Sequence, residues 1–253
     1  MNRWVAPSAQ IALMLIAPEK DDSSIVLVGS LNPAIFHPAW FALNEIVGKE
    51  EINDAKIDVV HNEVSRFVVR GIAISVDHFR FAASCASLHR ERVKDLVLVC
   101  FGNLLTQTPV RAMGINRSIH FKCPSEAIRN RVGQKLAPPA PWGTWGQEVL
   151  EAQGKSERHG GMIRLMMRQQ PRPDEYDGYI GVEVQPSELI KDNSGIHLEI
   201  NNHFQLTEKN EPVAAERAVE VLEKCWEFSM DKSVEICDQL MLLVERESGA
   251  VKK

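Results

Sequence analysis

Cysteine is scarce in this 253-residue chain and is never closely spaced. The count is odd, and no two cysteines form a C-x-x-C pair, so neither a disulfide framework nor a cysteine-rich zinc site is expected. Unpaired cysteines of this kind act as small hydrophobic residues in a reducing compartment. We therefore predict a bacterial-type cytoplasmic protein that folds without disulfides. The cysteines are Cys85, Cys100, Cys123, Cys225 and Cys237.

Long hydrophobic runs are also missing. The apolar run at 11–17 has seven residues, whereas a membrane-spanning helix needs about 20. Only Arg3 precedes this run and the charged residues 19–22 follow it, which matches a signal peptide poorly. We predict a buried strand at 11–17 and no membrane partner.

The familiar catalytic signatures are absent as well. The chain contains no GxGxxG, P-loop, H-E-x-x-H or G-x-S-x-G pattern and no kinase signature. The H-x-E at 197–199 begins like a zinc deaminase motif, but no P-C-x-x-C follows it. We therefore assign no catalytic residue, no metal and no cofactor, and we lean against an enzyme.

The residues that are present have an ordinary globular composition, with 44% hydrophobic and 25% charged residues. Short apolar runs that alternate with polar residues predict strands, with a turn at 21–24. Most neighbouring strands are joined by short turns and interleaved with helices, which indicates an α+β protein with a largely antiparallel sheet. The predicted strands lie at 25–31, 57–61, 67–69, 72–76, 79–83, 110–122, 162–169, 179–184 and 196–206.

Helical periodicity predicts helices at 38–47, 88–106, 125–136 and 212–247. The last has a stripe of mostly apolar residues, and its centre at 229–233 could kink it or split it in two. A continuous helix of this length would span about 50 Å at 1.5 Å per residue. The stripe could form a dimer seam or pack on the chain's own sheet. The stripe comprises Ala218, Leu222, Cys225, Ser229, Ile236, Leu240 and Val244.

We expect two similar halves, each a mainly antiparallel sheet covered on one face by helices. A ferredoxin-like order is one form that each half could take. The N-terminal α+β half would comprise 1–137, and the C-terminal β-β-β-α half 162–253. Between them, 138–161 is a connecting strap rich in proline, tryptophan and glycine.

Charge is unevenly distributed along the chain. Residues 111–172 contain eleven Lys or Arg and four Glu, a net charge of +7, which leaves −12 for the rest of a chain whose total is −5. Such segregation favours a polyanionic partner or association between complementary surfaces, unless folding disperses it.

Two strands present polar rows. In residues 195–204, GIHLEINNHF, alternation places His197, Glu199 and His203 opposite the apolar residues. Because alternate strand residues lie nearly 7 Å apart, His197 and His203 would be about 20 Å apart and could not share a metal ion. In residues 114–121, Asn116 and His120 face away from the apolar side, whereas alternation aims Arg117 at it.

Three functions follow from these features. The first is a non-catalytic accessory protein that binds a protein partner or assembles as a homo-oligomer. The second is nucleic-acid binding through the basic region 111–172. The third is a hydrolase whose site is assembled from distant residues, such as His120, His197 and Glu199. The candidate binding residues are Arg111, Asn116, Arg117, His120, Lys122, Arg129, Arg131, Trp142, Trp145, His197 and Glu199.

Overall fold

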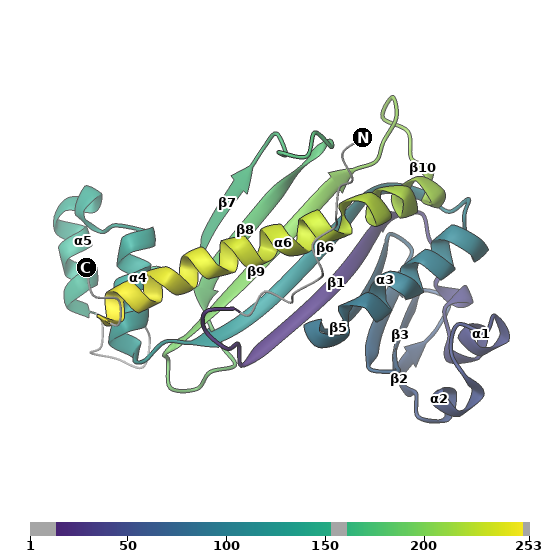
Figure 1. Cartoon of the computed structure of the whole chain (residues 1–253), viewed down its shortest axis with the longest axis horizontal. Coiled ribbons are helices and arrows are strands. Elements are labelled where there is room, and N and C mark those ends of the chain that lie inside the picture. Colours follow the sequence, from purple (N-terminus) through teal and green to yellow (C-terminus); the bar gives the residue numbers. More distant parts are fainter. Residues whose placement is uncertain (1–13, 153–160, 250–253) are drawn as a thin grey trace, which may run out of the picture.

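The protein is built on one broad antiparallel sheet with helices (Figure 1). This computed structural model describes residues 14–152 and 161–249. The ten strands follow the order β2-β3-β4-β5-β1-β6-β9-β8-β7, with β10 beside β6. The strands are β1 (Lys20–Gly29), β2 (Lys56–Val60), β3 (Val64–Val69), β4 (Ile72–Asp77), β5 (Arg80–Ala86), β6 (Pro109–Lys122), β7 (Leu165–Gln169), β8 (Gly178–Pro186), β9 (Gly195–Gln205) and β10 (Val213–Ala214). The helices are α1 (Pro38–Leu43), α2 (Lys49–Asn53), α3 (Arg90–Val99), α4 (Glu126–Leu136), α5 (Gly143–Ala152) and α6 (Ala215–Ser248).

The predicted α+β class is confirmed, as are the antiparallel sheet and the long C-terminal helix. β6 pairs with β9 from Ala112 to Lys122, so the two predicted halves share one sheet. The helix predicted at 88–106 is shorter: α3 ends at Val99, and a π-helical turn continues to Leu104. Within the described residues, no helix is both long and apolar enough to cross a membrane.

Two predictions near the N-terminus are wrong. Residues 14–17 form no strand, while 11–13 lie outside the described residues. The backbone amides of Leu15 and Ile16 instead donate to the side chains of Asp238 and Met241 on α6. The predicted turn at 21–24 is part of β1, because β5 and β6 both pair with this stretch and keep it extended.

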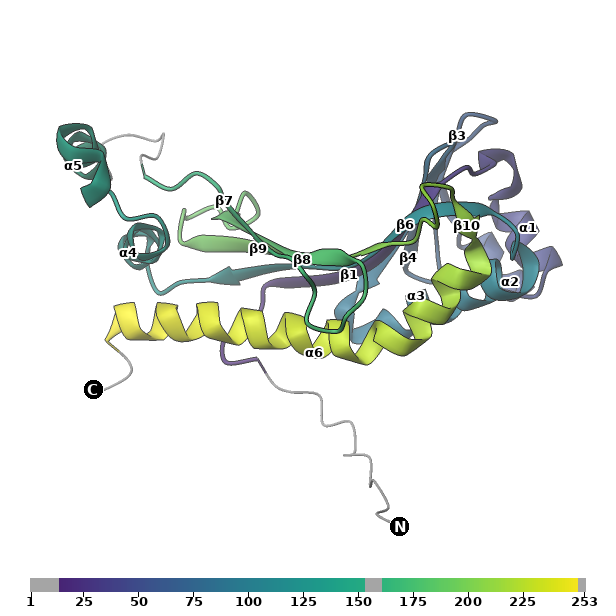
Figure 2. The ribbon, with the colours of Figure 1, turned by 90° about the horizontal axis from the view of Figure 1, so that it is seen from above.

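The sheet is bowed, and α6 runs along its convex side (Figure 2). The buried hydrophobic side chains of α3, α4 and α6, and Phe41 of α1, belong to the two hydrophobic cores. On the concave side, no helix of the described part covers the central strands. We call this concave side the open face. Helices α4 and α5 lie beyond one end of it, and β3 rises at the other.

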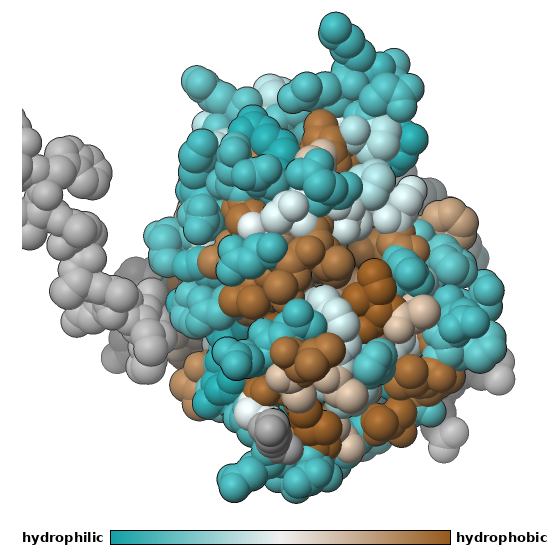
Figure 3. Space-filling view, turned by 90° about the vertical axis from the view of Figure 1, so that its right-hand side faces the viewer, coloured by the Kyte–Doolittle hydropathy of each residue, from teal (hydrophilic) through white to brown (hydrophobic). Residues whose placement is uncertain are grey.

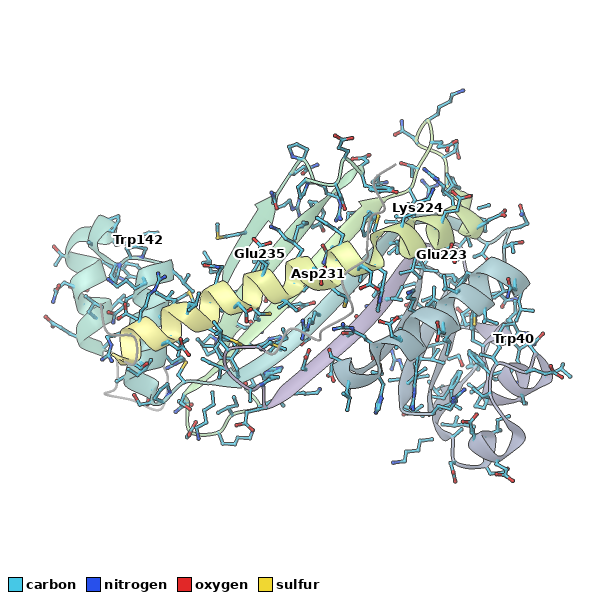
Figure 4. The ribbon with its side chains drawn as sticks, in the orientation of Figure 1. Trp40, Trp142, Glu223, Lys224, Asp231 and Glu235 are labelled. Atoms are coloured by element: carbon cyan, nitrogen blue, oxygen red, sulfur yellow. The ribbon has the colours of Figure 1, made fainter. Side chains whose placement is uncertain are left out.

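α6 is continuous, and its 34 residues cross the sheet strands obliquely (Figure 1). The predicted stripe faces the sheet: Ile236 is half-buried and the other six residues are buried. The outer surface of the helix carries charged side chains, including Glu223, Lys224, Asp231 and Glu235 (Figure 4). The stripe therefore packs on the chain's own sheet, and the helix continues through 229–233 without a break, although Figure 2 shows that it bends along its length. Gly249, in the left-handed conformation, ends the helix.

Two hydrophobic cores lie under α6, separated by a layer of polar side chains. On β6, Ile115 belongs to one core and Ile119 to the other, with Arg117 between them. On β9, Asn202 separates Phe204 from Ile200 in the same way. We call this layer the polar belt. It comprises Asp21, Arg117, Asn202, Ser229 and Ser233.

The polar belt contains one ion pair between strands β6 and β1 and one set of hydrogen bonds that joins the sheet to α6. The guanidinium of Arg117 donates to both carboxylate oxygens of Asp21, at 3.0 and 2.7 Å. The side-chain amide of Asn202 donates to the carbonyl of Ser229 and the hydroxyl of Ser233, both at 3.4 Å. Because polar groups buried between apolar cores must find partners, the belt restricts how α6 can slide along the sheet.

The end of the molecule that carries α1 and α2 exposes hydrophobic residues in its middle, surrounded by hydrophilic ones (Figure 3). Leu43 of α1 is 82% exposed, whereas Phe41 of the same helix is fully buried. The Phe41 ring packs edge-on against Phe67 of β3, with ring centroids 5.5 Å apart. α1 thus packs on the core at this end through Phe41 and, beside it, the part-buried Trp40.

We predict that Arg117→Ala lowers the free energy of unfolding by about 3 kcal/mol, because it leaves the part-buried Asp21 carboxylate with the Ser87 hydroxyl as its remaining side-chain partner. Urea unfolding followed by circular dichroism measures the change. Arg131→Ala is the matched control: its ion pair with Glu247 is about half exposed on the arginine side, and its loss should cost at most about 1 kcal/mol. Equal losses for the two variants would contradict the role of the polar belt.

Candidate binding site on the open sheet face

The open face of the central strands is polar because side chains alternate along each strand. On β9, Ile196, Leu198 and Ile200 are buried beneath α6. His197 and Glu199 alternate with them and therefore lie on the open face. The division of faces predicted for this strand is found in the structure.

Strand pairing brings the two predicted polar rows together. In the register of β6 and β9, His120 is opposite His197, and Asn116 is opposite Asn201. The imidazole rings of His120 and His197 stack with their centroids 4.1 Å apart and their planes 3° apart. These histidines are 77 positions apart in the sequence, and only the sheet register places them in contact.

His197 is held by hydrogen bonds from two other strands. The amide nitrogen of Gln185 on β8 lies 3.0 Å from Nδ1 of His197, and Ser118 Oγ lies 2.9 Å from Nε2. An amide nitrogen can only donate, so Nδ1 of a neutral His197 accepts, and Nε2 carries the proton. Nε2 therefore donates to Ser118 and is not available to remove the hydroxyl proton, as a general base would have to.

His120 is held in a similar way by Ser187, which follows β8. Ser187 Oγ lies 2.8 Å from Nδ1 of His120 and accepts from the backbone amides of Leu189 and Ile190. Burial, together with the neighbouring His197 and Lys20, lowers the pKa of His120 to about 4. Burial also lowers the pKa of His197. Both rings are therefore neutral near pH 7.

A second stack crosses β9, β8 and β7. The rings of His203 and Tyr179 stack at 4.6 Å between centroids. The guanidinium carbon of Arg168 lies 3.8 Å from the Tyr179 ring centroid. A cation over an aromatic face is held by the ring quadrupole. Three strands thus contribute flat side chains to one ordered group on the open face.

Gly114 on β6 makes room for two amide side chains beside this group. A Cβ atom at Gly114 would come within 3.2 Å of Oδ1 of both Asn116 and Asn201. Any larger residue would push the two amides apart. The glycine therefore allows these side chains to lie close to the sheet, which keeps this part of the open face flat.

Of the remaining predicted binding residues, some lie on the open face and two are buried in the fold. Lys122 and Glu199 lie on the open face; Lys122 pairs with Asp192, and both partners are about half exposed. Arg117 lies under α6, as alternation predicted. Arg129 is also buried, with 6% of its surface exposed, and pairs with Glu126 on α4. These two arginines are parts of the fold and not of a binding surface.

Arg111, Arg131 and the two tryptophans lie outside the central group. Arg111 donates to the carbonyl of Asn210. Trp142 and Trp145 are 65% and 59% exposed and contact each other edge-on at one end of the molecule, where Figure 4 shows Trp142 beside α5. The predicted binding residues therefore do not form one continuous site.

The basic charge of 111–172 is largely compensated within the fold. Nine of its Lys and Arg residues fall in the described part, and six of these pair with carboxylates from several elements. Paired guanidinium and ammonium groups are less available to a polyanion. The six residues are Arg117, Lys122, Arg129, Arg131, Arg164 and Arg172.

The sequence analysis did not predict any binding residue on β7 or β8. Gln185, Tyr179 and Arg168 complete the two stacked groups, yet each lies on a different strand from its partners. The alternation of Ile180, Val182 and Val184 with polar neighbours was a usable signal for the polar face. It could not indicate which side chains on other strands these polar neighbours meet.

The arrangement offers binding contacts and no assembled metal centre within the described residues. No group of three His, Cys, Asp or Glu side chains in 14–152 and 161–249 is placed to hold a metal ion. Comparison with protein-family models and with curated protein sequences finds no match to the chain. The site geometry alone therefore supports the functional proposal.

The histidine stack predicts a pH dependence of stability. Because the folded-state pKa of His120, about 4, is below its unfolded value of about 6.5, the unfolded state binds more protons between these values. Stability contributed by His120 is therefore present above about pH 6.5 and is lost as the pH falls toward 4. We expect a loss on the order of 2 kcal/mol between pH 7 and pH 4.5.

Urea unfolding of the wild type and His120→Gln at the two pH values measures this contribution. The glutamine variant should lose less stability over the same interval, since it has no titrating group at this position. Identical pH dependence in the two proteins would show that the stack does not set it.

Proposed function

We propose that the protein is a non-catalytic binding protein whose open face receives a protein partner. The observation that carries the proposal is the side-chain order on this face: two stacked groups, drawn from four strands, are fixed by hydrogen bonds and ring contacts. Solvated faces are common in antiparallel sheets, and long side chains on them are usually free to move. Fixed side chains lose less conformational entropy when a partner binds.

The composition and shape of the face support the same function. Tyrosine and arginine are enriched at protein interfaces, and here Tyr179 and Arg168 lie together. The concave bow of the sheet offers a broad surface with raised ends (Figure 2). Against a hydrolase, the hydrogen bond from Gln185 leaves His197 in the wrong tautomer to activate Ser118.

Matched charge reversals test this function. Glu199 is exposed on the open face, and Glu223 is exposed on the outer surface of α6. Full-length protein is used for affinity purification from nuclease-treated native lysate of the source cells, with mass spectrometry as the readout. We expect a stoichiometric partner that Glu199→Lys reduces roughly tenfold, since an opposed charge disfavours docking, and that Glu223→Lys retains.

Light scattering in low and high salt completes the test. A strict monomer in both conditions, with no stoichiometric partner recovered, would remove the support for a binding role. A homodimer disrupted by Glu199→Lys would identify the partner as a second copy of the chain.

Nucleic-acid binding is the second candidate, and the stack of Arg168, Tyr179 and His203 is the observation that favours it. Aromatic and guanidinium planes on an antiparallel sheet can stack on unpaired bases. If this is the function, fluorescence anisotropy should show mixed single-stranded oligonucleotides binding at low salt, weakening steeply as salt rises. Tyr179→Ala should then reduce the affinity about tenfold. No binding at low salt would eliminate this candidate.

The proposal includes a common plan for the two halves. In each half, antiparallel strands lead into a helix: β3 to β5 precede α3, and β8 and β9 precede α6. Three statements stay predictions. They are a ferredoxin-like order of elements in each half, a cytoplasmic location, and the domain boundaries 1–137, 138–161 and 162–253.

A further inference from the structure

β7 is the last strand on one side of the sheet, and its outer edge differs from the opposite edge. β7 pairs with β8 over all five residues without a register shift, and no other described strand pairs with it. At the opposite edge, β2 carries Lys56 and Asp58 and has a register shift between Ile57 and Val59. Bulges and charges protect a sheet edge from pairing. β7 has no bulge, and its edge is therefore suited to receive another strand.

The side of β7 that faces α6 borders an apolar groove. The groove has a volume of about 450 Å³, and Leu165 and Met167 line it from the strand. Val182 of β8 forms its floor next to Val184, and Leu240 and Leu243 of α6 contribute from the helix. Met167 is 66% exposed there. A strand added at this edge would place every second side chain against this apolar surface.

The opposite side of β7 is basic. Cross-strand pairing puts Met166 opposite Glu183 and Arg168 opposite Gly181, so these residues and Arg164 point to the open face. Arg164 pairs with Glu183 at 2.5 Å. Arg168 stacks on Tyr179 and makes no ion pair with a described residue. An added strand would therefore meet one unneutralised positive charge on this side, that of Arg168, since Glu183 already neutralises Arg164.

The arginines on this side of β7 indicate which kind of strand could pair with its edge. In antiparallel pairing of two β7 strands centred on Met166, Arg164 of each copy would lie opposite Arg168 of the other. Like charges directly opposite each other are destabilising, which disfavours a second copy of the chain. An acidic side chain opposite Arg168 would instead neutralise it, and a second acidic side chain four residues away, about 13 Å along a strand, would share Arg164 with Glu183.

We propose that the outer edge of β7 binds an extended peptide segment of a partner protein by strand addition. The segment carries acidic residues on the side facing Arg164 and Arg168, and apolar residues on the side facing the groove. This inference goes beyond the proposed function, because it concerns the sheet edge and stands independently of a partner on the open face.

A labelled peptide with the core Glu-Val-Thr-Val-Glu tests the proposal. Its two glutamates have the four-residue spacing, its valines face the groove, and its threonine lies opposite Met166. We expect saturable binding by fluorescence anisotropy. Arg168→Glu should weaken the affinity roughly tenfold, since it replaces an attractive cross-strand pair by a repulsive one. Arg66→Glu, an exposed arginine on the open face of β3, should change the affinity less than about twofold.

Backbone methylation of the peptide separates strand addition from side-chain docking. Alternate amides of a strand point to opposite edges, so N-methylation of one alternate set should abolish binding, and methylation of the other should not. Circular dichroism checks that each protein variant is folded.

Three outcomes would overturn the proposal: no binding at about 1 mM peptide, equal binding to wild type and Arg168→Glu, or equal binding of the two methylated peptides. A homodimer that Met167→Lys dissociates would assign the edge to a second copy. Glu199→Lys should leave peptide binding unchanged, which separates this result from the fate of the proposed function.

Discussion

The packing of α6 against the convex side of the sheet is the constraint on which the rest of the structure depends. The helix closes both hydrophobic cores, and the polar belt between those cores fixes its position. Apolar contacts alone would let a helix of 34 residues shift along the sheet at little cost. The hydrogen bonds of Asn202 to Ser229 and Ser233 would be lost in such a shift, and the buried amide would lose its partners on the helix.

A consequence of this packing is that the two faces of the sheet have different roles. The convex face holds the cores, and the concave face keeps polar and small residues in order. The neutral, stacked histidines illustrate the difference. On a mobile surface they would titrate near their usual pKa, whereas here burial lowers the pKa of His120 to about 4. A fixed, uncharged centre with charged residues around it is suited to contact and poorly suited to proton transfer.

Much of the fold could be predicted from local patterns. Alternation identified β4, β6 and β9 and assigned their faces, and Arg117 was correctly aimed at the apolar side. The residues at 21–24 show where this approach fails. Two aspartates followed by two serines have the composition of a turn, but hydrogen bonds from both neighbouring strands keep them in β1. In β1, the Ser23 side chain is buried, and the Asp21 carboxylate forms an ion pair with the Arg117 guanidinium.

The sequence by itself determined the class of the protein, most of its elements and which side of each strand is polar, because these depend on side-chain periodicity within a few residues. Only the tertiary structure decided which polar side chains meet. The contacts of His120 with His197 and of Arg168 with Tyr179 depend on strand order and register, which are set by pairing between distant segments. The basic excess of 111–172 was dispersed for the same reason: folding brought carboxylates from elsewhere in the chain to most of its described arginines and lysines.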